Sequence, residues 1–238
     1  MSSLRAVLFD IDDTLVATSS FAALARRNAA AAMVKAGLDV PLEDVVRELS
    51  EVIAEFSSNY DHHFDKLIQR LDVDLGGKNQ ALVVAAGVVA YHDTKFKELR
   101  PFNDVIPLLT DLRAAGVLTG IITHGWTVKQ AEKLIRLKLV PHFDPRAIFI
   151  SDQIGISKPN PKLYQTALRT LGLEPGEVMY VGDSPAHDVA PAKSLGMISV
   201  FSSRASRYKI EETDVVPDHS VADFGELREI LANQYGIL

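Results

Sequence analysis

Three carboxylates stand close together near the amino end of the chain, in the run Asp10-Ile11-Asp12-Asp13-Thr14. The run follows the short apolar segment 6–9, so these acidic side chains are expected at the end of a buried strand. Residues two apart on extended backbone point the same way, which lets Asp10 and Asp12 converge on one reacting group. Such crowding of negative charge costs energy unless a cation neutralises it. The alternative is an acidic turn that only caps the next helix.

Two further groups of polar residues follow later apolar segments. Thr123 ends the first of these segments and is followed by His124 and Gly125, where a glycine lets backbone N–H groups approach an anion closely. Lys158 places a cation before a turn that Pro159 stiffens, although a lone lysine of this kind is usually a solvated surface residue. Neither group identifies a site by itself.

The last acidic group, Gly182-Asp183-Ser184-Pro185-Ala186-His187-Asp188, also follows an apolar segment. Hard carboxylate oxygens of this kind suit Mg²⁺, which needs only a few of them because it keeps several waters. As an alternative, Asp183 and Asp188 are helix N-terminal acids that the helix dipole stabilises, a description that fits Asp188 better than Asp183. In open α/β sheets ligands bind beyond the carboxyl ends of the strands, which is where these groups are expected.

The segments that must position these residues alternate between strands and helices. Apolar runs predict five strands, and helical spacing predicts four helices between them, at 6–9, 117–123, 147–150, 178–181 and 197–201 and at 103–115, 128–137, 161–171 and 188–195. Parallel strands need crossover connections, so the predicted fold class is α/β, with a doubly wound three-layer α/β/α core around a parallel sheet. Arg204, Arg207 and Lys209 form a basic cluster that is expected in a solvated loop.

The stretch between the first and second strands lacks a convincing strand signal. Helical patterns cover most of it, at 19–36, 41–56, 62–71 and 80–91. We therefore expect an all-helical cap domain, residues 16–99, inserted in a core domain made of residues 1–15 and 100–238. The cap residues Asn59, Tyr60, His62 and His63 either face the cleft and select substrate or form an exposed helix start.

Composition narrows the classes of function. The chain has 238 residues and a formal net charge of −6, so it has no net attraction for nucleic acid or anionic lipid. It has no cysteine, which excludes disulfides, thiolate catalysis and cysteine-bound metals. Its apolar runs are too short for a signal peptide or a membrane span, so a cytoplasmic protein is expected. Its expected oligomeric state is a monomer or a homodimer.

Taken together, the four groups resemble the motifs of the haloacid dehalogenase-like hydrolase superfamily, and residues 16–99 resemble its type 1 cap. The resemblance implies that Asp10 is a nucleophile that becomes an aspartyl-phosphate and that Asp12 acts as general acid and then as general base. It also implies that Thr123 and Lys158 hold phosphoryl oxygens, with His124 and Gly125 beside them. His124 departs from the pattern, because this position is often Asn or Asp in the family.

The same resemblance implies Mg²⁺ as cofactor. Its ligands would be the Asp10 carboxylate, the Asp12 main-chain carbonyl and Asp183, with Asp188 acting through water or by orienting its neighbours. The carboxylate that attacks phosphorus is itself negative, so a metal ion and a lysine are needed to offset its repulsion of the phosphate.

The expected function is phosphatase activity on a small phosphomonoester. Segments 57–60 and 91–96 are similar to the archaeal branch that includes glyceraldehyde 3-phosphate phosphatases, which makes that ester a candidate substrate. A general acid at Asp12 argues against a dehalogenase, whose leaving group needs no such proton donor. Two alternatives stay open: a phosphomutase that uses the same intermediate, and a non-catalytic scaffold that binds phosphate.

Overall fold

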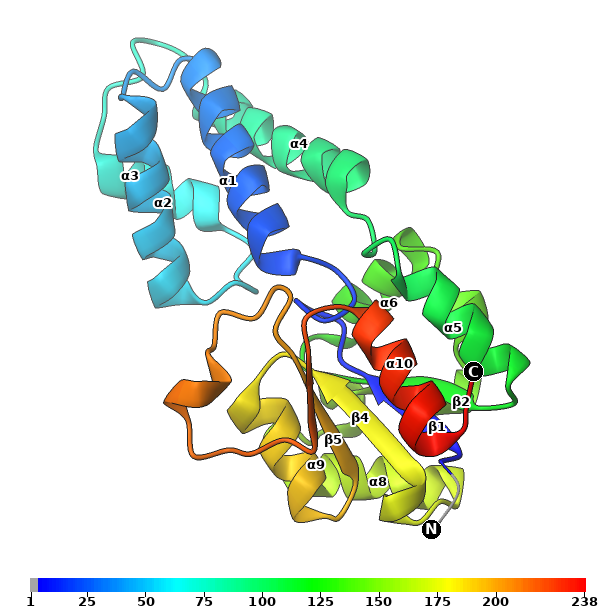
Figure 1. Ribbon diagram of the computed structural model, residues 1–238. Coiled ribbons are helices and arrows are strands. Elements are labelled where there is room, and N and C mark those ends of the chain that lie inside the picture. The colour runs from blue at the N-terminus through cyan, green and yellow to red at the C-terminus, as the bar shows by residue number, and fades with distance from the viewer. Residues whose placement is uncertain (1–3) are drawn as a thin grey trace. The chain divides into compact units, whose positions relative to one another are not determined.

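A six-stranded parallel sheet forms the centre of the larger of two units in the chain (Figure 1). The computed structural model describes residues 4–238, and this unit contains residues 4–18 and Arg100–Leu238. The strand order is β3-β2-β1-β4-β5-β6. The strands are β1 Ala6–Phe9, β2 Leu118–Thr123, β3 Ile148–Ile150, β4 Val178–Gly182, β5 Ile198–Ser202 and β6 His219–Val221.

The central strand, β1, fixes where the polar loops emerge. It pairs in parallel with both β2 and β4, and its last residue, Phe9, is opposite Ile121 on one side and Val181 on the other. All four residues of β1 are fully buried, as expected for a strand that is covered on both faces. Because the three strands end at nearly the same level, the residues that follow them lie at one edge of the sheet.

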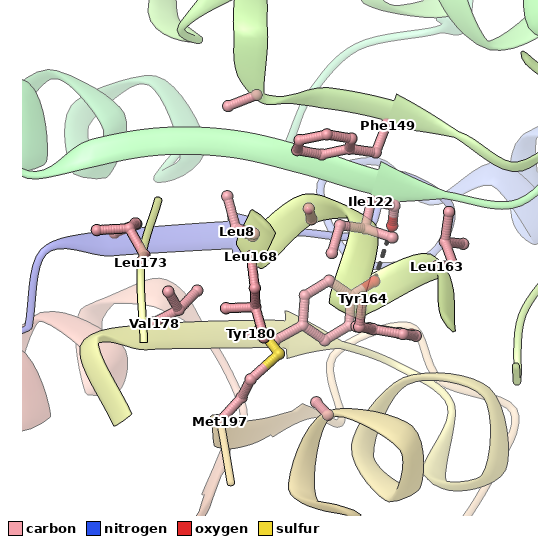
Figure 2. Close-up of a cluster of buried hydrophobic side chains, with 14 residues drawn as sticks. Leu8, Ile122, Phe149, Leu163, Tyr164, Leu168, Leu173, Val178, Tyr180 and Met197 are labelled. Carbon is pink, nitrogen blue, oxygen red and sulfur yellow. Dashed lines mark hydrogen bonds between the residues drawn. The ribbon is translucent and has the colours of Figure 1, made fainter. Parts of the chain in front are cut away.

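Helices cover both faces of the sheet. On one face, α8 (Pro161–Leu171) and α9 (Ala190–Ser194) enclose a core in which Leu8 and Ile122 of the sheet pack with residues such as Leu163 and Leu168 (Figure 2). On the other face the Phe9 ring lies 5.7 Å from the Phe224 ring, between centroids, and α5 (Val105–Ala114) contacts α10 (Phe224–Tyr235). This arrangement confirms the predicted α/β fold class with a parallel sheet.

The second unit, Ser19–Leu99, is helical and has a hydrophobic core of its own. Its helices are α1 Thr18–Lys35, α2 Leu42–Phe56, α3 His63–Leu71 and α4 Gln80–Glu98. A Cβ on Gly87 of α4 would lie 2.9 Å from Met33 of α1, so the glycine allows these two helices to pack closely. Met33, Leu49, Leu67 and Val83 are among the buried residues of this core.

Several local predictions were wrong. The helix expected to end at 91 continues to Glu98, and the helix expected at 188–195 begins earlier, as a wide turn over Pro185–Val189 that continues into α9. The strand β6, the helix α10 and the short helix α7 (Ser151–Ile154) were not predicted. Arg204 is not in a solvated position, because its guanidinium pairs with Asp104 and only 14% of its side chain is exposed.

Candidate active site

A buried lysine connects two of the strand-end carboxylates. Lys158 comes from the loop before α8, and its Nζ lies 2.7 Å from Asp10 Oδ1 and 2.6 Å from Asp188 Oδ1. All three side chains are buried. Burial would lower the pKa of the Lys158 ammonium, but Asp10 and Asp188 raise it well above its usual value, so this lysine stays charged. The lysine is therefore part of the site, and the surface alternative is wrong.

A tyrosine that was not singled out in the sequence holds the third donor position of Lys158. Tyr180 is on β4, and its hydroxyl accepts a hydrogen bond of 2.7 Å from Lys158 Nζ. The same hydroxyl donates to the backbone carbonyl of Ile122 at 2.8 Å (Figure 2). The Tyr164 ring packs edge-on against the Tyr180 ring, with 5.0 Å between centroids, and its hydroxyl donates to the carbonyl of His187. The Tyr180 hydroxyl is thus held beside Lys158 by the Ile122 carbonyl and by the packing of two aromatic rings.

Asp10, Asp183 and Asp188 form a group that could hold a metal ion, since each offers an oxygen within 4.8 Å of the others. Burial raises the pKa of Asp10 to about 7 despite the opposing charge of Lys158. Burial and the repulsion of Asp188 and Asp10 raise the pKa of Asp183 to about 8. Lys158 supplies only one positive charge for three carboxylates, so the group favours a further cation. An all-oxygen donor set of carboxylates fits Mg²⁺.

Asp188 owes its position to the turn at the end of β4. Its Oδ2 accepts a hydrogen bond of 2.9 Å from the Ser184 backbone N–H, while its Oδ1 contacts Lys158. A Cβ on Gly182 would lie 2.5 Å or less from atoms of the Asp188 carboxyl group. Gly182 at the strand end therefore leaves room for the Asp188 side chain. The next residue, Asp183, contributes its own carboxylate to the group at the sheet edge.

Two buried hydroxyls at the sheet edge have no hydrogen-bond partner in the described part of the chain. They are Thr14 Oγ1, in the acidic loop after β1, and Thr123 Oγ1, at the end of β2. A buried hydroxyl without a partner is costly, and a bound ligand often supplies the missing partner. The two hydroxyls indicate a place for a group rich in hydrogen-bond acceptors.

In the loop after β2, the backbone N–H of Gly125 was expected to approach an anion, but it is bonded within the protein. The Gly125 backbone N–H donates to Ser151 Oγ at 3.0 Å, and a Cβ on this glycine would lie 2.7 Å from Gln130 Nε2. Gly125 has a φ of +136°, which also favours glycine. The His124 ring is anchored, with Nδ1 2.8 Å from Ser157 Oγ. Burial lowers the pKa of His124, and the nearby Lys158 lowers it further.

Asp12 takes a separate set of partners and is not in the group of three carboxylates. Its Oδ1 accepts from Thr18 Oγ1 at 2.6 Å and pairs with Lys133 Nζ, while its Oδ2 accepts from Gln130 Nε2 at 3.0 Å. Burial alone would raise the pKa of Asp12, but Lys133 lowers it below its usual value, with help from Thr18 and Gln130. Gln130 and Lys133 lie on α6 (Thr127–Arg136), and neither was predicted to belong to the site.

The candidate substrate-selecting residues lie in the second unit, around the loop between α2 and α3. The Tyr60 ring stacks on the Phe56 ring at 5.1 Å and meets the rings of His62 and His63 edge-on. The His63 Nε2 lies 2.7 Å from the carbonyl oxygen of Ser57. Tyr60 is therefore the centre of an aromatic cluster that includes both imidazoles. Asn59 is in the same loop.

A family model described as haloacid dehalogenase-like hydrolase matches residues 4–196 of the chain. The chain is also 47% identical to the glyceraldehyde 3-phosphate phosphatase of Methanopyrus kandleri, over 93% of this chain and 92% of that protein. It is 38% identical to the protein of the same name in Methanocaldococcus jannaschii, over 97% and 98% of the two chains. The chain therefore belongs to the haloacid dehalogenase-like hydrolase family. Within this family it is a phosphoric monoester hydrolase.

Solved structures agree with this assignment. A phosphatase of the family from Thermococcus onnurineus is 29% identical and superposes with a TM-score of 0.66, covering 97% of this chain and 99% of that chain. A protein described as a putative beta-phosphoglucomutase from Thermotoga maritima has a TM-score of 0.72 at 20% identity, over 95% and 100% of the two chains, and shows the fold alone. Among the described residues, no helix is both long and apolar enough to span a membrane.

Proposed function

We propose that the chain hydrolyses a small phosphomonoester through an aspartyl-phosphate on Asp10, with Mg²⁺ as cofactor. The observation that carries the proposal is the contact between Asp10 and the charged, buried Lys158 at a sheet edge with two unpartnered threonine hydroxyls. A carboxylate beside a fixed cation and free donors is suited to meet a tetrahedral anion. Thr123 and Lys158 are the proposed phosphate ligands, with His124 and Gly125 in the loop beside them.

The first step transfers the phosphoryl group to the protein. An oxygen of Asp10 forms a bond to phosphorus while the ester P–O bond breaks, and the leaving oxygen takes a proton from Asp12. In the second step, a water oxygen forms a bond to phosphorus while the bond between phosphorus and the Asp10 oxygen breaks, and the water gives a proton to Asp12. Phosphate is released, Asp10 is again a carboxylate and Asp12 is again protonated. In the described part of the chain Asp12 is paired with Lys133 and Asp10 with Lys158, so the proposed acid–base residue and nucleophile have separate lysine partners.

Mg²⁺ would be held by the carboxylates of Asp10 and Asp183 and the main-chain carbonyl of Asp12, with Asp188 as a further ligand directly or through water. When bound, the ion would offset the charge of the phosphoryl oxygens and of the attacking carboxylate. The three carboxylates within 4.8 Å and their raised pKa values support this part of the proposal.

Glyceraldehyde 3-phosphate is the proposed substrate, because two relatives that match over nearly their full length are named glyceraldehyde 3-phosphate phosphatase. We also propose that residues 16–99 act as a cap that limits substrate size, with Asn59, Tyr60, His62 and His63 as candidate selecting residues. A capped site favours small phosphorylated metabolites over proteins and nucleic acids.

The test is phosphate release from a panel of esters that includes glyceraldehyde 3-phosphate, with and without Mg²⁺. The expected result is phosphate release that needs Mg²⁺ and is abolished in Asp10→Asn. Quenching the reaction with acid should also trap radiolabelled protein when the phosphoryl group of the ester is labelled. Binding of phosphate without turnover would indicate a scaffold, and isomerised ester in place of free phosphate would indicate a mutase. Either result would overturn the proposal.

A further inference from the structure

Two side chains of α6 reach the carboxylate of Asp12. Gln130 and Lys133 are three residues apart, so they lie on the same face of the helix. Lys133 Nζ pairs with Asp12 Oδ1, and Gln130 Nε2 lies 3.0 Å from Asp12 Oδ2. Each oxygen of this carboxylate therefore has a donor from α6.

The orientation of the Gln130 amide is fixed by what surrounds it. Its Nε2 faces two acceptors, Asp12 Oδ2 and the backbone carbonyl of His124 at 2.6 Å, so the nitrogen and not the oxygen must point toward them. The Gln130 side chain is buried, and it occupies the space beside Gly125 that a side chain would fill. The amide thus connects the loop after β2 to the loop after β1.

The Lys133 side chain is also held in place, since only 15% of it is exposed. Its sequence neighbours on the outer face of α6 do not share this position: Ile135 is 66% exposed. A lysine that only kept the protein soluble would have its ammonium in solvent. The Lys133 ammonium instead lies against the Asp12 carboxylate.

We propose that Lys133 and Gln130 are positioning residues that act through Asp12, which rests on the proposed function of Asp12 as general acid. When the ester P–O bond breaks, the Asp12 O–H bond breaks too, and its proton goes to the leaving oxygen. Lys133 and Gln130 hold both oxygens of the Asp12 carboxyl group, so the proton is donated from a fixed position. The two residues would therefore speed the reaction only where the leaving oxygen needs a proton.

The test compares two esters whose leaving groups differ. The alkoxide of glyceraldehyde 3-phosphate is strongly basic and needs a proton to leave, whereas the nitrophenolate of 4-nitrophenyl phosphate leaves without one. The ratio kcat/KM reports the steps up to the first irreversible bond cleavage, so it isolates the step in which Asp12 donates. We expect Lys133→Met to lower kcat/KM for the alkyl ester by about 10- to 100-fold and for the aryl ester by roughly threefold at most.

Three further variants complete the experiment. Lys133→Arg keeps the charge and should recover part of the loss, and Gln130→Met should shift the ratio between the esters in the same direction. Lys138→Met removes an exposed lysine just beyond α6 and should leave kcat/KM unchanged for both esters. If Lys133→Met does not fold, Gln130→Met makes the same comparison.

Equal losses on both esters, or no loss on either, would overturn the positioning role while the wild-type protein still releases phosphate. A wild-type protein that releases phosphate from neither ester would instead overturn the proposed function, and the positioning role with it. The two failures are therefore distinguishable from the wild-type activity alone.

Discussion

The Asp188 carboxyl group fills the space that a side chain on Gly182 would need. A Cβ at position 182 would lie 2.4 Å from Asp188 Cγ and 2.5 Å from its Oδ2. The strand end thus places an acid against bare backbone, which no other residue type at position 182 permits.

Gly182→Ala should therefore disturb the site more than the fold. We expect a loss of stability of about 1–3 kcal/mol from crowding, together with weaker Mg²⁺ binding and at least a tenfold fall in kcat, because Asp188 and its partner Lys158 must move. Gly172→Ala is the control: its added Cβ meets no atom within 4 Å, so only the strain of its positive φ applies. Unchanged Mg²⁺ affinity in Gly182→Ala would contradict this expectation.

The stability of the metal-free protein should depend on pH through Asp10 and Asp183. Their pKa values are raised to about 7 and about 8, from 3.8 in an unperturbed aspartate. Between about pH 4 and pH 8 the folded protein keeps protons that the unfolded chain has released, so stability should fall as pH rises through this range.

Mg²⁺ should reverse that trend, because it replaces the bound protons. We expect the rise in melting temperature on adding Mg²⁺ to be larger at pH 8 than at pH 6. Thermal unfolding at both values, with EDTA or with Mg²⁺, measures the difference. An equal Mg²⁺ effect at both values would show that Asp10 and Asp183 do not bind the ion in exchange for protons.

Tyr180→Phe should weaken both stability and catalysis. The change leaves Lys158 without one acceptor and the Ile122 carbonyl without its donor, and both groups are buried, so a loss of about 1–3 kcal/mol is expected. A less firmly held Lys158 should also lower kcat several-fold. Tyr164→Phe, which removes a hydroxyl bonded to the His187 carbonyl, is the matched control and should keep kcat. Equal kcat values in the two variants would count against a role for Tyr180 in holding Lys158.

Asp104 should stabilise the protein only above acidic pH. Burial raises its pKa, but Arg204 and the Phe224 backbone N–H lower it below the usual value overall. Asp104→Asn should cost about 1 kcal/mol at pH 7, and the difference from the wild type should disappear as pH falls through the lowered pKa of Asp104. Chemical unfolding at pH 7 and pH 3 measures this. Glu43→Gln, which breaks the exposed pair with Arg27, should leave the melting temperature unchanged.

The sequence predicted the sheet edge well because its signals are local. Each strand is a short apolar run that ends in polar residues, and parallel pairing brings such ends together. The nearness of Asp10 and Asp188 follows from that rule, whereas Lys158 lies in the loop before α8 and was expected at the site only from the family resemblance. The roles of all three in metal binding and catalysis stay predictions.

The supporting residues could not be predicted in the same way. Tyr180 reads as one more apolar strand residue, and only the tertiary structure shows that its hydroxyl meets Lys158. In the sequence Lys133 looks like a solvated helix residue, and only the tertiary structure shows that its ammonium pairs with Asp12. The helix α10 did have a usable signal, since the Asp223 side chain caps it by accepting from the Glu226 N–H and Gly236 ends it. The strand β6 has only three residues and no comparable signal.

The place of β1 in the sheet has a consequence for synthesis on the ribosome. Residues 6–9 emerge before their neighbours in the sheet, which are 118–121 and 178–181. At about 5–20 residues per second, this apolar strand waits roughly 9–35 s for its second neighbour. During that time the helical unit encoded between the first two strands can form on its own core. The nascent larger unit therefore has a long period in which chaperones could shelter its first strand.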